Sequence, residues 1–112
     1  DLRDESFVSY PKEFDGRMYI DRIFAERQID RVMSAESQLS AAICVLVQHG
    51  AGVAIIDQIT ARYAAGRVII KPFEPTVLSG FSLVTSTQHP PSQLAKAFVD
   101  YTKQRMLEQF GD

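Results

Sequence analysis

The stretch Ser34–Asp57, SAESQLSAAICVLVQHGAGVAIID, decides how this chain folds. Polar residues open it, a nearly all-apolar run follows, and Gly50 and Gly52 interrupt the run before its last apolar residues. Ser, Glu and Ser before an apolar run are typical of a helix start, and glycine after the run is typical of a helix end. The pattern predicts a helix over Ser37–His49, a glycine turn, and a buried parallel strand over Val53–Ile56.

The rest of the chain alternates short strand-like runs with helical patterns. Besides the central strand, we expect strands at Phe7–Tyr10, Arg31–Ala35, Val68–Lys71 and Phe81–Thr85. Besides the central helix, we expect helices at Arg17–Gln28, Ile59–Ala65 and Ser92–Phe110. Strands that alternate with helices at this spacing predict an α/β fold with a mostly parallel sheet flanked by helices.

Composition narrows the class of protein. The chain has 112 residues, of which 46% are hydrophobic and 23% are charged, as in an ordinary globular domain. Its net charge of −2 argues against a nucleic-acid binder that acts alone. No apolar run reaches the roughly 20 residues of a membrane span. The chain begins at Asp1 and not at Met, so we expect a piece of a longer protein.

The predicted sheet points to a ligand site, because ligands of such sheets bind outside the carboxyl ends of the strands. Polar residues follow three of the predicted strands there: Ser9 and Tyr10, then Ser37, then Asp57. Ser37 is either a simple helix N-cap or part of a site where free N–H groups hold a ligand carboxylate. Ser34 takes this place if the helix starts earlier. Ser9, Tyr10, Ser37 and Asp57 are therefore the candidate ligand-binding residues.

The same candidates have structural alternatives. Tyr10, beside Pro11, is either half-buried packing or a ligand contact, and Ser9 shares its strand end. Asp57 is either a capping carboxylate just past a strand or a contact for a ligand amine or guanidinium. Lys12 and Arg17 flank a polar loop, and we expect both of them to be solvated.

Nothing in the sequence predicts a catalytic, metal or cofactor site. His49 and His89 have no second ligand at metal-binding spacing, and the single cysteine, Cys44, is expected to be a small buried apolar residue. The glycine turn leads into a strand, whereas nucleotide-binding loops lead from a strand into a helix. No Ser/His/Asp set and no pair of carboxylates stands out, so we do not expect an enzyme.

Four segments, taken together, resemble the effector-binding domain of LysR-type transcription regulators: DLRDESFVSY at Asp1–Tyr10, the helix and glycine turn of Ser34–Asp57, GRVIIKP at Gly66–Pro72, and Phe81–Phe98. Regulators of lysine biosynthesis and opine catabolism have similar sequences at the glycine turn and at the start of the last helix. The resemblance implies one lobe of a two-lobed, periplasmic-binding-protein-like (type II) effector domain. Many family members have an uncharged residue where this chain has Asp57.

The resemblance also implies an organisation and partners. Residues 1–88 would form the second lobe, and residues 89–112 a helix that returns to a first lobe. A small amino-acid- or opine-like effector would bind between the lobes. DNA would be bound only by a separate N-terminal domain, in a cytoplasmic homo-oligomer that is a tetramer when intact. No cofactor and no membrane contact is implied. A lobe of a periplasmic solute-binding protein is the alternative, and an enzyme of the same α/β class is the weakest one.

Overall fold

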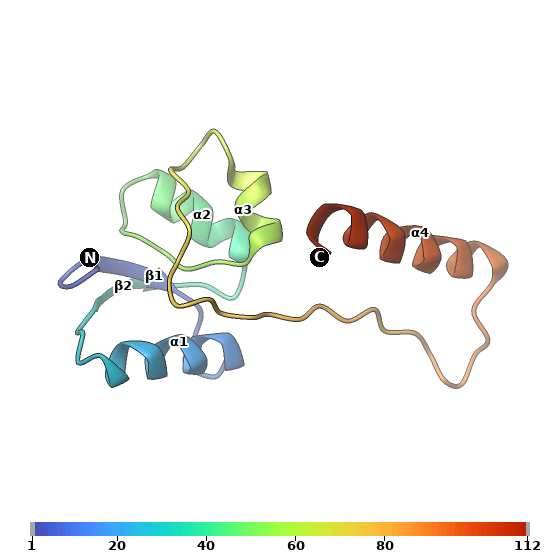
Figure 1. The fold of residues 1–112 in the computed structure, drawn as a ribbon, viewed down its shortest axis with the longest axis horizontal. Helices are drawn as coiled ribbons and strands as arrows, with labels where there is room; N and C mark the ends of the chain where they lie inside the picture. The colour runs from blue at the N-terminus through green and yellow to red at the C-terminus, as the bar shows by residue number, and fades with distance from the viewer. Residues whose placement is uncertain (1, 112) are drawn as a thin grey trace. The chain divides into compact units, whose positions relative to one another are not determined.

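The computed structural model describes residues 2–111, and these form two compact units that divide between Ser79 and Gly80. Figure 1 shows the order of the elements along the chain. The first unit contains β1 (Ser6–Ser9), α1 (Asp15–Glu26), β2 (Val32–Glu36), α2 (Ser40–Gln48) and α3 (Gln58–Ala64). The second unit contains α4 (Gln93–Phe110). The helices and the first two strands were therefore predicted to within a few residues.

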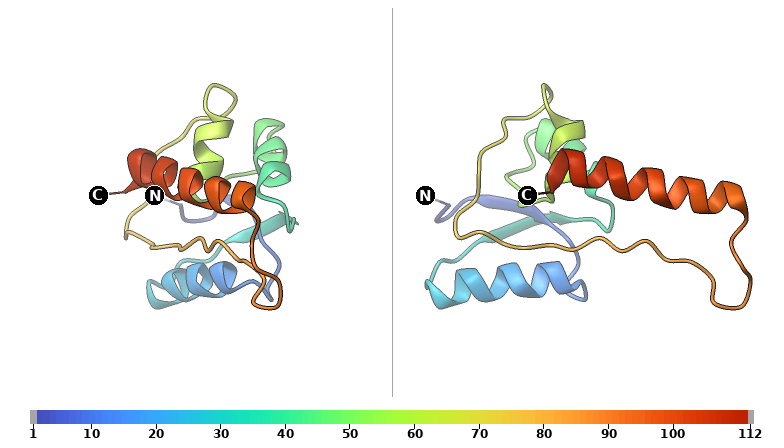
Figure 2. Two further views of the ribbon diagram at one scale, coloured as in Figure 1. Left: turned by 90° about the vertical axis from the view of Figure 1, so that its right-hand side faces the viewer. Right: turned by 45° about the vertical axis from the view of Figure 1, so that its right-hand side comes forward.

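The first unit is built on a β–α–β crossover. Strands β1 and β2 are parallel, with Ser6 opposite Val32 and Ser9 opposite Glu36. In Figure 2, α1 lies on one face of this sheet, and α2 and α3 lie on the other. Because the two strands are parallel, their carboxyl ends lie at the same edge of the sheet.

The core lies on both faces of β1. Phe7 and Val8 are each 1% exposed, and successive side chains of a strand point to opposite faces. Phe7 packs with Ile20, Ile23 and Phe24, and the rings of Phe7 and Phe24 meet edge to face with centroids 5.5 Å apart. Helix α2 contacts β1 from the other side and buries its Ile43 completely. The first half of the chain thus forms the packed core of the first unit.

The sheet is smaller than the sequence predicts. Within the described residues, Val53–Ile56 contributes one parallel bridge, in which the Val53 N–H donates to Ser6 O at 2.8 Å and Val8 N–H donates to Val53 O at 2.9 Å. The strands expected at Val68–Lys71 and Phe81–Thr85 are wrong: the former contains only the bridge of Val68 with Ala65. Apolar β-branched runs favour strands, but a strand forms only where a neighbour satisfies its backbone groups.

The glycine turn brings the third strand-like segment against β1. Gly52 has φ +150, and a Cβ atom built there would lie 2.3 Å from the Ser6 carbonyl oxygen. Only glycine allows this approach, which permits the bridge at Val53. The predicted turn after α2 is therefore confirmed, and its physical reason is contact between two backbones.

The second unit contains an extended segment and α4. Ser92 caps this helix, because its hydroxyl accepts from Ala95 N–H at 3.1 Å. None of the helix residues is buried, and Leu94, Phe98 and Tyr101 are 82%, 63% and 63% exposed. None of the helices described here is long and apolar enough to cross a membrane.

Candidate functional site

The carboxyl ends of β1 and β2 are joined by a backbone hydrogen bond. Ser37 N–H, just after β2, donates to Ser9 O at 3.0 Å. Ser9, Tyr10 and Ser37 therefore lie together at one edge of the sheet, where ligands of parallel sheets bind. The structure brings together the candidates that the sequence placed after these two strands.

Tyr10 is the best-connected of the four candidates. Its hydroxyl and the Ser40 hydroxyl, in the first turn of α2, form a hydrogen bond of 2.6 Å, and its ring stacks on Phe14. Burial raises the pKa of the Tyr10 phenol, the bond to Ser40 opposes this, and the negative charge of Asp57 adds to the rise. The phenol is therefore neutral at neutral pH.

Asp57 joins the site from the third strand-like segment. Val53 bridges to Phe7 in the parallel sense, so Val53–Ile56 runs in the same direction as β1 and leads Asp57 toward the edge where β1 and β2 end. The carboxylate also caps α3: Oδ1 accepts from Thr60 N–H at 2.8 Å, and Oδ2 accepts from the Thr60 hydroxyl at 2.7 Å. The capping interpretation is confirmed, and the negative charge of Asp57 also raises the pKa of Tyr10.

Ser37 does not cap the central helix, so that part of the prediction is wrong. Helix α2 starts three residues later, at Ser40, and Leu39 occupies its N-cap position without a side-chain hydrogen bond. The Ser37 hydroxyl instead accepts from Leu39 N–H at 3.2 Å, in a turn between β2 and α2. Ser34 lies within β2, and its single hydroxyl proton can donate to Ala51 O at 2.6 Å or to Phe7 O at 3.1 Å.

The prediction for Arg17 is also wrong. This residue was expected to be solvated, yet its side chain is 4% exposed and bonds both to α1 and to the strand ends. Nε donates to both oxygens of Asp21, and Nη1 donates to Tyr10 O at 2.8 Å and to Glu36 Oε1 at 2.9 Å. A signal was present: Arg17 lies three and seven residues before Ile20 and Phe24, on the apolar face of α1.

A second basic residue, Arg31, contacts Asp21, the carboxylate that also binds Arg17. The Arg31 guanidinium lies over the rings of Phe7 and Phe24, 5.2 Å and 4.2 Å from their centroids, and donates to Asp21. Asp21 therefore bridges two guanidinium groups. Burial raises its pKa, but the bonds to Arg31 and Arg17 outweigh this and hold the pKa below its usual range.

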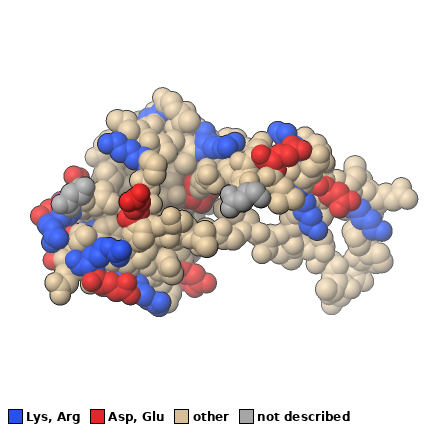
Figure 3. All heavy atoms as spheres, viewed as in Figure 1, with Lys and Arg blue, Asp and Glu red and all other residues tan. Residues whose placement is uncertain are grey.

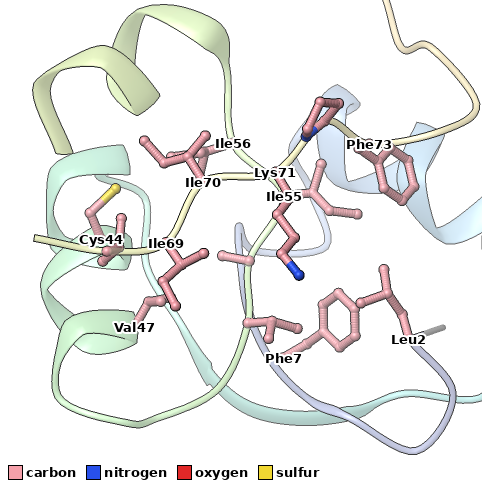
Figure 4. A pocket seen from close by; sticks show the side chains of 14 residues that line it. Leu2, Phe7, Cys44, Val47, Ile55, Ile56, Ile69, Ile70, Lys71 and Phe73 are labelled. Carbon is pink, nitrogen blue, oxygen red and sulfur yellow. The ribbon is translucent and has the colours of Figure 1, made fainter. Parts of the chain in front are cut away.

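An open apolar groove of about 590 Å³ lies between Val53–Ile56 and Val68–Phe73. Figure 4 shows Cys44 and Val47 of α2 on one side, Phe7 on another, and the Lys71 amine among apolar side chains. Cys44 is only partly buried, contrary to expectation, and burial raises the pKa of its thiol. None of the four candidate residues lines this groove.

On the face seen in Figure 3, basic and acidic side chains of the first unit alternate. Among the residues that the structure describes, no three His, Cys, Asp or Glu side chains lie close enough to hold a metal ion. The polar groups of the strand ends are hydroxyls, backbone amides and a carboxylate, which can bind a small polar molecule through hydrogen bonds.

Residues 1–107 match the family described as the LysR substrate binding domain, so the chain belongs to this family of transcription regulators, which are not enzymes. Over the described residues 2–111 the fold is accordingly mixed α/β, with a small parallel sheet and four helices, consistent with a lobe of the LysR effector domain.

Two curated regulators illustrate the relationship. The chain is 30% identical over 99 residues to the "Transcriptional activator protein LysR" of Escherichia coli (strain K12), covering 88% of this chain and 32% of that protein. It is 34% identical over 99 residues to the "Regulatory protein NocR" of Agrobacterium tumefaciens (strain T37), covering 88% of this chain and 33% of that protein. The chain thus spans about a third of the length of these relatives.

Proposed function

We propose that this chain is the effector-sensing part of a LysR-type DNA-binding transcription regulator, and that its first unit is one wall of a cleft for a small amino-acid- or opine-like ligand. The observation that carries the proposal is that three segments run parallel and lead to one edge: β1 to Tyr10, β2 to Ser37, and the segment that bridges to Phe7 to Asp57. A lobe of a periplasmic solute-binding protein is the alternative, and membership of a regulator family favours the first function.

Each proposed contact has a chemical role. The Ser9 and Ser37 hydroxyls and the Tyr10 phenol, which stays neutral, donate or accept hydrogen bonds with the polar backbone of an amino acid. Asp57 supplies the negative charge that attracts an ammonium or guanidinium group. Because its two oxygens already accept from Thr60, Asp57 is held in one orientation before a ligand arrives.

The proposal extends to the whole regulator. Residues 1–88 act as the second lobe, and α4 returns to a first lobe, which the exposed Leu94, Phe98 and Tyr101 support as a packing face. DNA is bound by a separate N-terminal domain in a cytoplasmic homotetramer. Effector binding shifts the equilibrium between two shapes of the tetramer and so changes transcription.

Substitution of Ser37 in the intact regulator tests the function. Lysine, arginine and their opine conjugates serve as probes, and promoter activity is measured against probe concentration. We expect Ser37→Ala to move the response to higher concentration, because it removes a hydroxyl from the cleft. Ser92→Ala, which removes a helix cap in α4, should leave the response midpoint unchanged. An unchanged curve for Ser37→Ala would remove this residue from the site.

A further inference from the structure

One nitrogen of Arg17 contacts both strands that carry the proposed site. Its Nη1 donates to the carbonyl oxygen of Tyr10, just after β1, and to the carboxylate of Glu36, the last residue of β2. The same guanidinium is fixed to α1 through Nε and Asp21. A buried guanidinium has five donors in a rigid fork, so these bonds set distances and angles together.

The neighbours of these two contacts are the candidate ligand residues. Glu36 directly precedes Ser37, and the Tyr10 carbonyl belongs to the residue whose phenol bonds to Ser40. The hydrogen bond that Ser37 N–H donates to Ser9 O joins the same two strand ends. We infer that Arg17 is a positioning residue, which holds Tyr10 and Ser37 at their working separation by clamping the carboxyl ends of β1 and β2. This inference rests on the proposed function.

Asp21 provides a matched control for this clamp. Asp21 and Glu36 both bond to Arg17, and their side chains are 38% and 40% exposed. Only Glu36 lies on a strand that ends at the site, whereas Asp21 lies on α1. Asp21 accepts more bonds than Glu36, so a merely structural role of Arg17 predicts that Asp21→Asn disturbs the site at least as much as Glu36→Gln. A clamp at the strand ends predicts that Glu36→Gln alone disturbs the site.

The experiment has two readouts in the intact regulator. The first is the ¹⁹F resonance of Tyr10 in protein labelled with 3-fluorotyrosine. This chain has four tyrosines, and the resonance that disappears in Tyr10→Phe is that of Tyr10. The second is binding of lysine and arginine by calorimetry. We expect Glu36→Gln and Arg17→Lys to shift the Tyr10 resonance and to weaken binding about tenfold, while Asp21→Asn keeps both near the wild-type values.

The outcomes separate the clamp from the proposed function. If Asp21→Asn shifts the Tyr10 resonance as much as Glu36→Gln or more, or if neither shifts it, Arg17 does not position the strand ends and the inference fails. If the wild-type protein binds neither probe, the proposed class of ligand fails, and the Tyr10 resonance still decides whether the clamp exists. Arg17→Lys repeats the test with a residue that keeps the positive charge but lacks the planar guanidinium and its five donors.

Discussion

Arg17 and Asp21 show how a charged pair can lie at the edge of a hydrophobic core. The Arg17 side chain is almost fully buried, and burying a guanidinium is costly unless its donors are paired. Burial lowers its pKa, but the bonds to Glu36 and Asp21 outweigh this, so the pKa is raised and Arg17 stays charged. Loss of either carboxylate therefore leaves a buried cation with fewer partners.

The first prediction concerns the pH dependence of stability. The pKa of Asp21 is lower in the folded protein than in the unfolded chain, so its ionisation stabilises the fold above about pH 4 and this stabilisation is lost as the pH falls. Asp21→Asn should therefore flatten the fall in the free energy of unfolding between about pH 5 and pH 2. Because the carboxylate is 38% exposed, the effect is about 1 kcal/mol or less.

Denaturant titrations at a series of pH values measure this effect. Glu108→Gln is the control, because Glu108 pairs with Arg105 on the surface of α4 and both side chains are about half exposed. Its curve should follow that of the wild type. Curves for Asp21→Asn and wild type that run parallel down to pH 2 would show that the Arg17 and Arg31 contacts do not stabilise ionised Asp21.

At the scale of the elements, the glycine turn determines where the third segment lies. The Cβ atom of an alanine at position 52 would overlap the Ser6 carbonyl oxygen, and φ at this residue is +150, where side chains are strained. β1 and the segment that starts at Val53 would have to move apart to relieve the overlap, which would break their hydrogen bonds. The turn thus couples the end of α2 to the strand on which the site is built.

Gly52→Ala should lower the free energy of unfolding by about 1–3 kcal/mol or more. Gly16→Ala is the matched control, because Gly16 lies in the first turn of α1 with no heavy atom within 4 Å of an added Cβ. There alanine should be neutral or stabilising by up to about 1 kcal/mol. Equal effects of the two substitutions in urea titrations would contradict the close approach of Gly52 and Ser6.

The sequence predicted the positions of the helices better than it predicted which strands pair in the sheet. Apolar spacing located α1, α2, α3 and α4, and Ser92 marked the start of α4. The start of α2 was placed too early, because a polar run looks like a cap even where Leu39 takes that position. The strand expected at Val68–Lys71 failed because pairing depends on neighbours that local composition does not specify.

The same limit explains what was predicted of the site. The rule that ligands bind beyond the carboxyl ends of parallel strands selected Ser9, Tyr10, Ser37 and Asp57, and in the structure all four end or follow segments that run parallel toward one edge. Arg17 was missed because a charged residue near a loop is usually solvated, and its burial depends on Glu36, nineteen residues away. Partners so distant in sequence are apparent only in the folded chain.

At the scale of the whole molecule, the two units differ in how they bury apolar surface. The first unit has a core around Phe7, Phe24 and Ile43, whereas α4 leaves Leu94 and Phe98 exposed. A helix with an exposed apolar face is stabilised by packing against another surface. This contrast fits the proposal that the first unit is a lobe and that α4 completes another lobe in the intact regulator.

The central claim is that the strand-end edge of the first unit senses a small ligand with a basic group. Its most direct test is the thermal midpoint of the intact regulator, titrated with lysine, arginine and their opine conjugates. Ligand that binds the folded state stabilises it by about 2.7 kcal/mol at a concentration one hundred times its Kd. Asn at position 57 can still cap α3, so Asp57→Asn removes the charge while the helix keeps its cap.

We predict that at least one of these compounds raises the midpoint of the wild-type protein and that Asp57→Asn loses most of this rise, with a midpoint without ligand close to that of the wild type. A panel in which no compound raises the midpoint, or in which Asp57→Asn responds as the wild type does, would contradict the account of this edge as a site for a basic ligand.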